Sequence, residues 1–329
     1  MLAPWLQSQL QVLLAQRGHA WLLAGPSGLG QYALALDLVR AWLCEKPAAQ
    51  GACGTCSSCH AIEVRTHGDV FVLMPETTLI ERSWPLSEKA QTEIDEKKRK
   101  PSREIRIEAM RDAIEFCQRS DARGRGKAVL IYPAERMNQV AANALLKTLE
   151  EPYGDVRFVL ASEAAHQLAP TVRSRCMAHA MVWPQTAAAL AWLADQGLAE
   201  PQARVLLRAA GGRPDDALAY AQSGRDAAAW AALPRAMFRG DGALLRDWSP
   251  AQTLDALHKL SHDMLAQGLG AEPRYFAADD LPGAASLAAL TRWGQQLRAA
   301  SRNAEHPFNA GLMLEALVNQ AQNALNSGH

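Results

Sequence analysis

Four cysteines lie in one short segment of the chain, at the spacing Cys44-x8-Cys53-x2-Cys56-x2-Cys59. Four thiolates are the ligand number of a tetrahedral structural zinc site, and the glycines between the cysteines allow the chain to turn tightly around a metal. Two overlapping Cys-x-x-Cys pairs with a fourth cysteine exceed what redox chemistry needs, so a redox site is the second interpretation and an iron–sulfur cluster the third. The spacing predicts structural zinc.

A glycine-rich loop containing Gly25, Gly28 and Gly30 follows a short apolar run and precedes a segment with helical spacing. This order of elements is typical of a phosphate-binding loop. The next two residues should be Lys, which contacts the phosphates, and Ser or Thr, which binds Mg²⁺. Here they are Gln31 and Tyr32. We interpret the segment as a phosphate loop without its chemistry, and an ordinary glycine-rich turn is the alternative.

A nucleotide hydrolase also needs an acidic residue at the end of a second strand, to hold the metal and polarise water. The candidate strand over 127–132 ends at Tyr132 and Pro133, and Glu135 comes only after the strand has ended. Two separate positions therefore lack the residue types that hydrolysis needs, which predicts a fold kept without the activity. The alternative is a divergent active ATPase in which Gln31 and Glu135 suffice.

Two arginines lie in the segment that contains Ser174, Arg175 and Cys176. Near the end of a helix or strand, an arginine most often forms a surface or structural ion pair. Taken alone, the segment indicates no function.

These motifs must be positioned by strands and helices that alternate along the first half of the chain. Apolar runs predict strands over 19–24, 127–132 and 157–161, and helical spacing predicts helices over 31–43 and 139–151. Such alternation indicates an α/β layer with a mainly parallel sheet. The sequence beyond Trp183 is rich in Ala and Leu with helical spacing. We therefore divide the chain into domains over 1–181, 182–224 and 225–329.

The composition excludes several classes of protein. A hydrophobic fraction of 49% in 329 residues is that of a globular protein and not of a disordered or fibrous one. Lys+Arg 34 against Asp+Glu 34 gives zero net charge, which argues against a self-sufficient zinc-dependent nucleic-acid-binding module. No apolar run is long enough for a membrane span, and the N-terminus lacks a basic leader, so we expect a cytoplasmic protein. The charge-rich segment 81–106 predicts a solvated insertion or mobile loop.

The segment AANALLKTLEEP over 141–152, followed by Ser174, Arg175 and Cys176, closely resembles the bacterial clamp-loader branch of the AAA+ ATPases. The cysteine spacing after a phosphate loop occurs in the same family. Members with an intact loop are the motor subunits gamma and tau of DNA polymerase III. This chain looks like the member that has a zinc module but no working loop.

The resemblance implies roles for individual residues. Tyr132 and Pro133 stand where motor subunits carry an Asp-Glu pair, and Asp215 stands where they carry a sensing arginine. Arg175 matches the arginine that family members project into the nucleotide site of the neighbouring subunit, where it stabilises charge on the transferred phosphoryl group. The implied activity is assistance in trans to hydrolysis that the chain itself does not perform, with no working ATP/Mg²⁺ site of its own.

The family architecture implies an AAA+ α/β module, a small helical lid domain and an all-α C-terminal collar domain that joins a ring-like pentamer. The implied partners are the gamma and tau motor subunits and the delta subunit, with the sliding clamp and primed DNA reached through the complex. The chain would be the rigid member against which the motors move, and it has no membrane partner.

Overall fold

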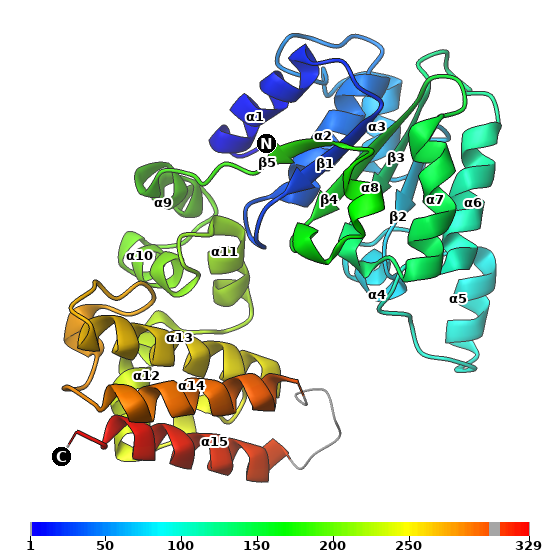
Figure 1. Ribbon diagram of the computed structural model, residues 1–329. Coiled ribbons are helices and arrows are strands. Elements are labelled where there is room, and N and C mark those ends of the chain that lie inside the picture. Colours follow the sequence, from blue (N-terminus) through cyan, green and yellow to red (C-terminus); the bar gives the residue numbers. More distant parts are fainter. Residues whose placement is uncertain (1, 303–309, 329) are drawn as a thin grey trace. The chain divides into compact units, whose positions relative to one another are not determined.

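Five parallel strands form one sheet in the N-terminal part of the computed structural model (Figure 1), in the order β2-β3-β4-β1-β5. The structure describes residues 2–302 and 310–328; residues 1, 303–309 and 329, some of them in the predicted C-terminal domain, lie outside this range. The strands are β1 Ala20–Ala24, β2 Val70–Leu73, β3 Lys127–Ile131, β4 Val156–Ser162 and β5 Met177–Ala180.

The three central strands are the apolar runs of the sequence. All residues of β3 and nearly all of β1 and β4 are buried, as expected for a parallel sheet covered on both faces. The edge strands β2 and β5 were not predicted. Strand β5, with the sequence MAHA, is mostly exposed and forms no apolar run. Strand β2, with the sequence VFVL, is an apolar run of only four residues, most of them only partly buried, and the prediction overlooked it.

Helices cover both faces of this sheet (Figure 1). Helix α2 packs against β1, β3 and β4, while α6 packs against β2 and α7. The predicted helices over 31–43 and 139–151 are confirmed as α2 and α7. The helices are α1 Pro4–Ala15, α2 Gln31–Leu43, α3 Ser57–Glu63, α4 Glu76–Glu81, α5 Glu88–Asp95, α6 Ile107–Gln118, α7 Gln139–Glu150 and α8 Pro170–Arg173, with short 3-10 turns at Ala134–Arg136 and Ala165–Gln167.

The segment 81–106 is charged and largely exposed, as expected for a solvated insertion, but it is not a loop throughout. It contains helix α5, and its side chain Trp84 is buried. The guanidinium of Arg99 lies between two carboxylates, with Nη2 2.7 Å from Oε1 of Glu76 and Nε 2.7 Å from Oε2 of Glu93. Counting charged residues missed this order, because the charges pair with one another instead of remaining in water.

Helices alone make up the described elements of the second unit. The chain divides into the compact units Met1–Pro184 and Gln185–His329. The helices of the second unit are α9 Thr186–Asp195, α10 Glu200–Ala209, α11 Pro214–Gln222, α12 Ala227–Arg239, α13 Pro250–Gly268, α14 Leu287–Ser301 and α15 Ala310–Leu325, with 3-10 turns at Ala243–Leu245 and Ala278–Asp280. Within residues 2–302 and 310–328, no helix is long and apolar enough to cross a membrane.

The second unit has two hydrophobic clusters. One joins α9, α10 and α11 around Leu193 and Leu206, and the other joins α12 to α15 around Trp230 and Trp293. Helix α13 begins with a capping box in which the Ser249 hydroxyl accepts a hydrogen bond from the backbone N–H of Gln252. The division of this unit at about residue 224 stays a prediction.

A buried carboxylate fixes the connection that follows α13. Asp263 is fully buried and accepts hydrogen bonds from the backbone N–H groups of Arg274 at 2.9 Å, Tyr275 at 2.6 Å and Phe276 at 2.8 Å. These bonds hold the ring of Phe276 stacked on Trp230, with 4.8 Å between the ring centroids. Asp263 therefore ties the segment that carries Phe276 to the larger cluster of the second unit.

We expect Asp263→Ala to lower the free energy of unfolding of the second unit by at least about 3 kcal/mol, because each buried donor left without a partner costs about 1–3 kcal/mol. Hydrogen exchange of peptides from α12 to α14 in the full chain measures this loss. Asp247→Ala, at an exposed carboxylate of the same unit, is the control and should change the value by less than about 0.5 kcal/mol. Equal protection in Asp263→Ala and Asp247→Ala would contradict the assignment.

Candidate functional site

The glycine-rich loop lies between the end of β1 and the start of α2, where a phosphate loop belongs. Gly28 and Gly30 adopt left-handed backbone conformations, with φ of 75° and 90°. A Cβ on Gly30 would lie 2.5 Å from Cδ1 of Leu6, so helix α1 presses directly against the loop. The backbone therefore has the strand, glycine loop and helix order that a phosphate loop requires.

The side chain of Gln31 fills this loop from inside. It is 2% exposed, and its amide nitrogen donates hydrogen bonds to the carbonyl oxygens of Gly25 at 2.8 Å and Pro26 at 2.6 Å. A lysine at this position of a phosphate loop reaches outward to the phosphates. Gln31 is neutral and turns back onto the backbone that should hold the ligand.

The side chain of Tyr32 joins the loop to the segment that follows α4. Its phenol oxygen accepts a hydrogen bond of 2.7 Å from Nε1 of Trp84. The guanidinium carbon of Arg82 lies 4.2 Å from the centroid of the Tyr32 ring and 5.0 Å from that of Tyr132. A cation of the protein therefore lies against the ring of Tyr32, the residue that replaces the Mg²⁺-binding hydroxyl.

Tyr132, at the end of β3, completes this cluster. Its ring centroid lies 5.3 Å from that of Tyr32, and its hydroxyl donates a hydrogen bond of 2.6 Å to Oε1 of Glu163. Burial raises the pKa of the Tyr132 phenol, and the negative charge of Glu163 raises it further. The next residue, Pro133, carries no ionisable group. We call Tyr32, Arg82, Trp84, Tyr132 and Glu163 the aromatic plug.

Glu135, the acidic residue that could replace the metal-holding carboxylate, is bonded to the end of β4. Its Oε2 accepts a hydrogen bond of 2.7 Å from the hydroxyl of Ser162, and its Oε1 accepts one of 3.1 Å from the backbone N–H of Glu163. These bonds join the 3-10 turn after β3 to the end of β4. The Glu135 carboxylate therefore stabilises the end of β4.

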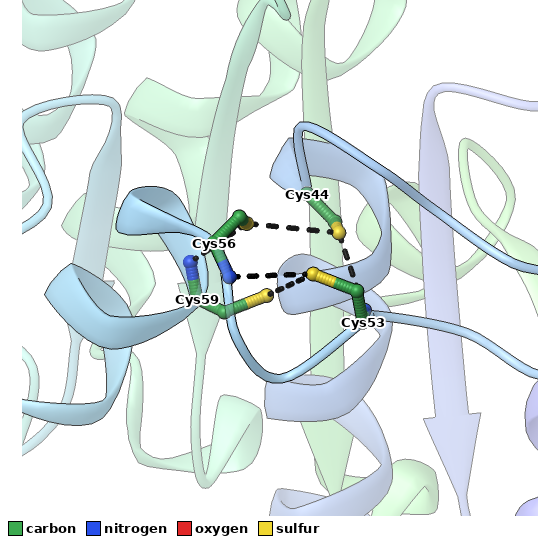
Figure 2. Close-up of side chains that lie close together, drawn as sticks. All are labelled: Cys44, Cys53, Cys56 and Cys59. Carbon is green, nitrogen blue, oxygen red and sulfur yellow. Dashed lines mark hydrogen bonds between the residues drawn. The ribbon is translucent and has the colours of Figure 1, made fainter.

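The four cysteines come together between α2 and α3, and Figure 2 shows their sulfur atoms facing one another. All four lie within 4.8 Å of one another, with 3.8 Å between Sγ of Cys44 and Cys56 and 4.0 Å between Sγ of Cys53 and Cys59. Sulfur atoms about 2.3 Å from one tetrahedral zinc ion lie about 3.8 Å apart. The group can hold a metal ion and is compatible with structural zinc. His60 is exposed and is not one of the group.

The backbone around the cysteines is arranged for thiolates. The N–H groups of Cys53, Cys56 and Cys59 point at the sulfur atoms of Cys44 at 3.2 Å, Cys53 at 3.4 Å and Cys56 at 3.5 Å. Hydrogen bonds from Thr55 lower the pKa of Cys53, whereas burial raises the pKa of Cys59. A metal ion would displace the proton that burial keeps on Cys59.

A network of polar side chains connects this cysteine segment to the loop before β3. The Oε1 atom of Glu45 accepts hydrogen bonds from the hydroxyl of Ser57 at 2.6 Å and from the backbone N–H of Ser58 at 3.1 Å. Arg123, in the loop before β3, donates to Glu45 at 3.2 Å and to the Ser57 hydroxyl at 2.6 Å. The network fixes the start of α3 and joins the cysteine segment to the sheet.

The third group of predicted residues lies at the surface, between α8 and β5. Ser174 is exposed, Cys176 is half-buried, and burial raises the pKa of its thiol to about 12. The side chain of Arg175 is 30% exposed and pairs with Glu150, with Nη2 2.9 Å from Oε2. The structure thus brings Gln31, Tyr32 and Tyr132 into one site, while the cysteines and Arg175 occupy places of their own.

Three residues of the aromatic plug were missed by sequence reasoning. Arg82 and Trp84 lie in the charge-rich segment, and Glu163 follows a buried strand. Glu163 carries the one usable signal, because a residue directly after a parallel strand lies at the ligand-binding edge of the sheet. For Arg82 and Trp84 the sequence offers no spacing that points to Tyr32.

Comparison with known proteins identifies the family. The model of a family described as "DNA polymerase III, delta subunit" matches residues 5–182. A DNA polymerase III subunit delta' of Pseudomonas aeruginosa is 35% identical over 96% of this chain and 96% of its own length. The Escherichia coli subunit delta' is 32% identical over 67% of this chain and 60% of its own length.

More distant relatives include another subunit of the same polymerase. The DNA polymerase III subunit tau of Salmonella typhimurium is 33% identical over 48% of this chain and 21% of its own length. Among solved structures, a gamma subunit-related protein of Thermotoga maritima superposes with a TM-score of 0.48 at 16% identity, over 97% of this chain and 99% of its own. The family model and the full-length match together show that this chain belongs to the delta' subunit family of DNA polymerase III.

Proposed function

We propose that this chain is a non-hydrolysing subunit of the DNA polymerase III clamp loader and that it supplies Arg175 as an arginine finger to the nucleotide site of a neighbouring subunit. One observation carries the proposal. The places of the phosphate-binding lysine, the Mg²⁺-binding hydroxyl and the metal-holding carboxylate are taken by Gln31, Tyr32 and Tyr132, and each of these side chains is bonded to other parts of the chain.

The aromatic plug argues against the alternative of a divergent ATPase. Hydrolysis requires a charged residue for the phosphates and a carboxylate that can hold Mg²⁺. Arg82 lies against two tyrosine rings, and Glu135 is bonded to Ser162 and Glu163. Freeing either group would break contacts at the sheet edge, so neither is available to a nucleotide.

The surface position of Arg175 supports the second half of the proposal. An arginine finger must reach a phosphoryl group that belongs to another subunit, so it must lie where a partner can approach. Arg175 meets this requirement, because its side chain is 30% exposed at the end of the short helix α8.

The same proposal includes the assembly. We assign residues 1–181 to the AAA+ module, 182–224 to the lid and 225–329 to the collar. The two hydrophobic clusters of the second unit, one centred on α9 to α11 and the other on α12 to α15, support this division. The partners would be the gamma and tau motor subunits and the delta subunit. The complex, acting in the cytoplasm as part of the polymerase holoenzyme, would load the sliding clamp onto primed DNA with this chain as its rigid member.

The central prediction concerns Arg175→Ala in a reconstituted complex. The motor subunits used should carry alanine in place of their own finger arginines, so that Arg175 is the remaining finger. Because such an arginine contributes about 10³-fold or more to turnover, we expect ATP hydrolysis to fall by at least about 100-fold while assembly, followed by gel filtration, is unchanged. Lys147→Ala, at an exposed residue of α7, is the control.

Unchanged hydrolysis in the assembled Arg175→Ala complex would refute the finger role. A second result would refute the other half of the proposal, namely Mg²⁺-dependent ATP turnover by the purified chain alone at the rate of a motor subunit. In the assembled complex, Glu135→Gln should leave turnover unchanged within about twofold, whereas a divergent ATPase would lose its activity.

We also propose that the cysteines hold one structural zinc ion. The ion would fix Cys44, Cys53, Cys56 and Cys59 together, and its chemistry would be purely structural because all four coordination positions are filled by the chain. We expect about one zinc per chain by elemental analysis, and about four fewer reactive thiols per chain in the native than in the chelator-treated protein.

The matched variants for this prediction are Cys59→Ser and Cys117→Ser. Cys117 is a buried thiol of α6 outside the cluster. Removal of one ligand should lower the zinc content well below one per chain and expose the segment between α2 and α3 to proteolysis, while Cys117→Ser keeps its zinc. A fully folded, metal-free preparation with four reactive thiols in this segment would reject the site.

A further inference from the structure

The side chain of Arg175 is held in place by two neighbours. Its Nε and Nη2 atoms donate hydrogen bonds of 3.2 and 2.9 Å to Oε2 of Glu150, the last residue of α7. Its Nη1 atom donates a hydrogen bond of 3.0 Å to the carbonyl oxygen of Thr171 in α8. One acidic side chain and one backbone carbonyl therefore hold three different nitrogens of the guanidinium.

The bonds to Glu150 and Thr171 do not use every N–H group of the Arg175 guanidinium. A guanidinium has five N–H groups, and the bonds to Glu150 and Thr171 use one at Nε, one at Nη1 and one at Nη2. Within the part of the chain that the structure describes, one N–H on each terminal nitrogen has no acceptor, and those two nitrogens form the outer edge of the group. Two parallel donors are what a phosphoryl oxygen pair accepts from an arginine.

The two neighbours are themselves firmly placed. Helix α7 is anchored by the buried side chains of Leu145 and Leu149 and begins at an Asn138 cap. It packs against α8, whose Val172 is buried. Glu150 also lies at the C-terminus of α7, where the helix dipole adds to the attraction of a cation. The Glu150 side chain, which is 61% exposed, therefore projects from a helix that is itself firmly packed.

We infer that Glu150 is a positioning residue for Arg175: it holds the guanidinium by its inner edge so that the outer edge is presented to the phosphoryl group of a neighbouring subunit. This inference rests on the finger role proposed above. An exposed ion pair is weak, but a long arginine side chain otherwise loses much rotamer freedom when it docks. Holding it beforehand removes part of that cost from the transition state.

The test uses the same complex, in which Arg175 is the remaining finger. We expect Glu150→Ala to lower kcat for ATP about threefold to fivefold and to leave KM within about twofold, because the ATP itself is bound by the neighbour. Glu150→Gln keeps an oxygen acceptor for Nε and Nη2, so it should restore kcat to within about twofold of the unmodified chain. Glu151→Ala, at the adjacent exposed carboxylate, is the control and should have no effect.

The double variant separates positioning from a general effect on folding. In the Arg175→Ala background, Glu150→Ala should cause no further loss of kcat, because the residue acts only through the arginine. A loss of the same size in both backgrounds, no loss in either, or a faster reaction in Glu150→Ala would overturn the inference. If Arg175→Ala itself has no effect on turnover, the finger role fails first, and this result is distinguishable from a failure of Glu150 alone.

Discussion

The C-terminal ends of the parallel strands β1, β3 and β4 lie side by side in the sheet. The side chains of the aromatic plug lie at these strand ends. A nucleotide-binding protein leaves the strand ends open for phosphates and a metal. Here Arg82 supplies the positive charge and Glu163 the negative charge, with the rings of Tyr32 and Tyr132 between the loop and the strand end. These groups contact one another, so the charges of Arg82 and Glu163 are paired within the fold.

Helix α2 joins these strand ends to the cysteine segment. Its first residue, Gln31, is bonded into the glycine loop, and its last turn leads directly to Cys44. The other three cysteines lie before and at the start of α3, which Glu45 and Arg123 connect to the loop before β3. A metal at the cysteines would therefore hold one end of the helix whose other end closes the phosphate loop.

The sequence predicted what depends on local pattern. The central strands follow from apolar runs. The cysteine cluster could be predicted because all four cysteines lie within one short segment at a spacing typical of metal sites. The sequence did not predict contacts between distant segments. Trp84 reaches Tyr32 across 52 positions, Arg82 reaches Tyr132 across 50, and Tyr132 reaches Glu163 across 31. Such contacts follow from the order of strands in the sheet, which spacing along the chain does not encode.

Two arginines of the N-terminal unit, Arg82 and Arg175, differ in their surroundings. Arg82 lies against two aromatic rings and donates to Tyr132, so its charge stabilises the plug. In Arg175, Nε and Nη2 donate to Glu150 and Nη1 donates to Thr171, which leaves one further N–H on each terminal nitrogen. A cation whose contacts lie within the fold stabilises the chain that carries it, whereas one with two free donors at the surface can act on another molecule. Zero net charge is compatible with the proposed finger role, because that role needs one well-placed arginine and not a basic surface.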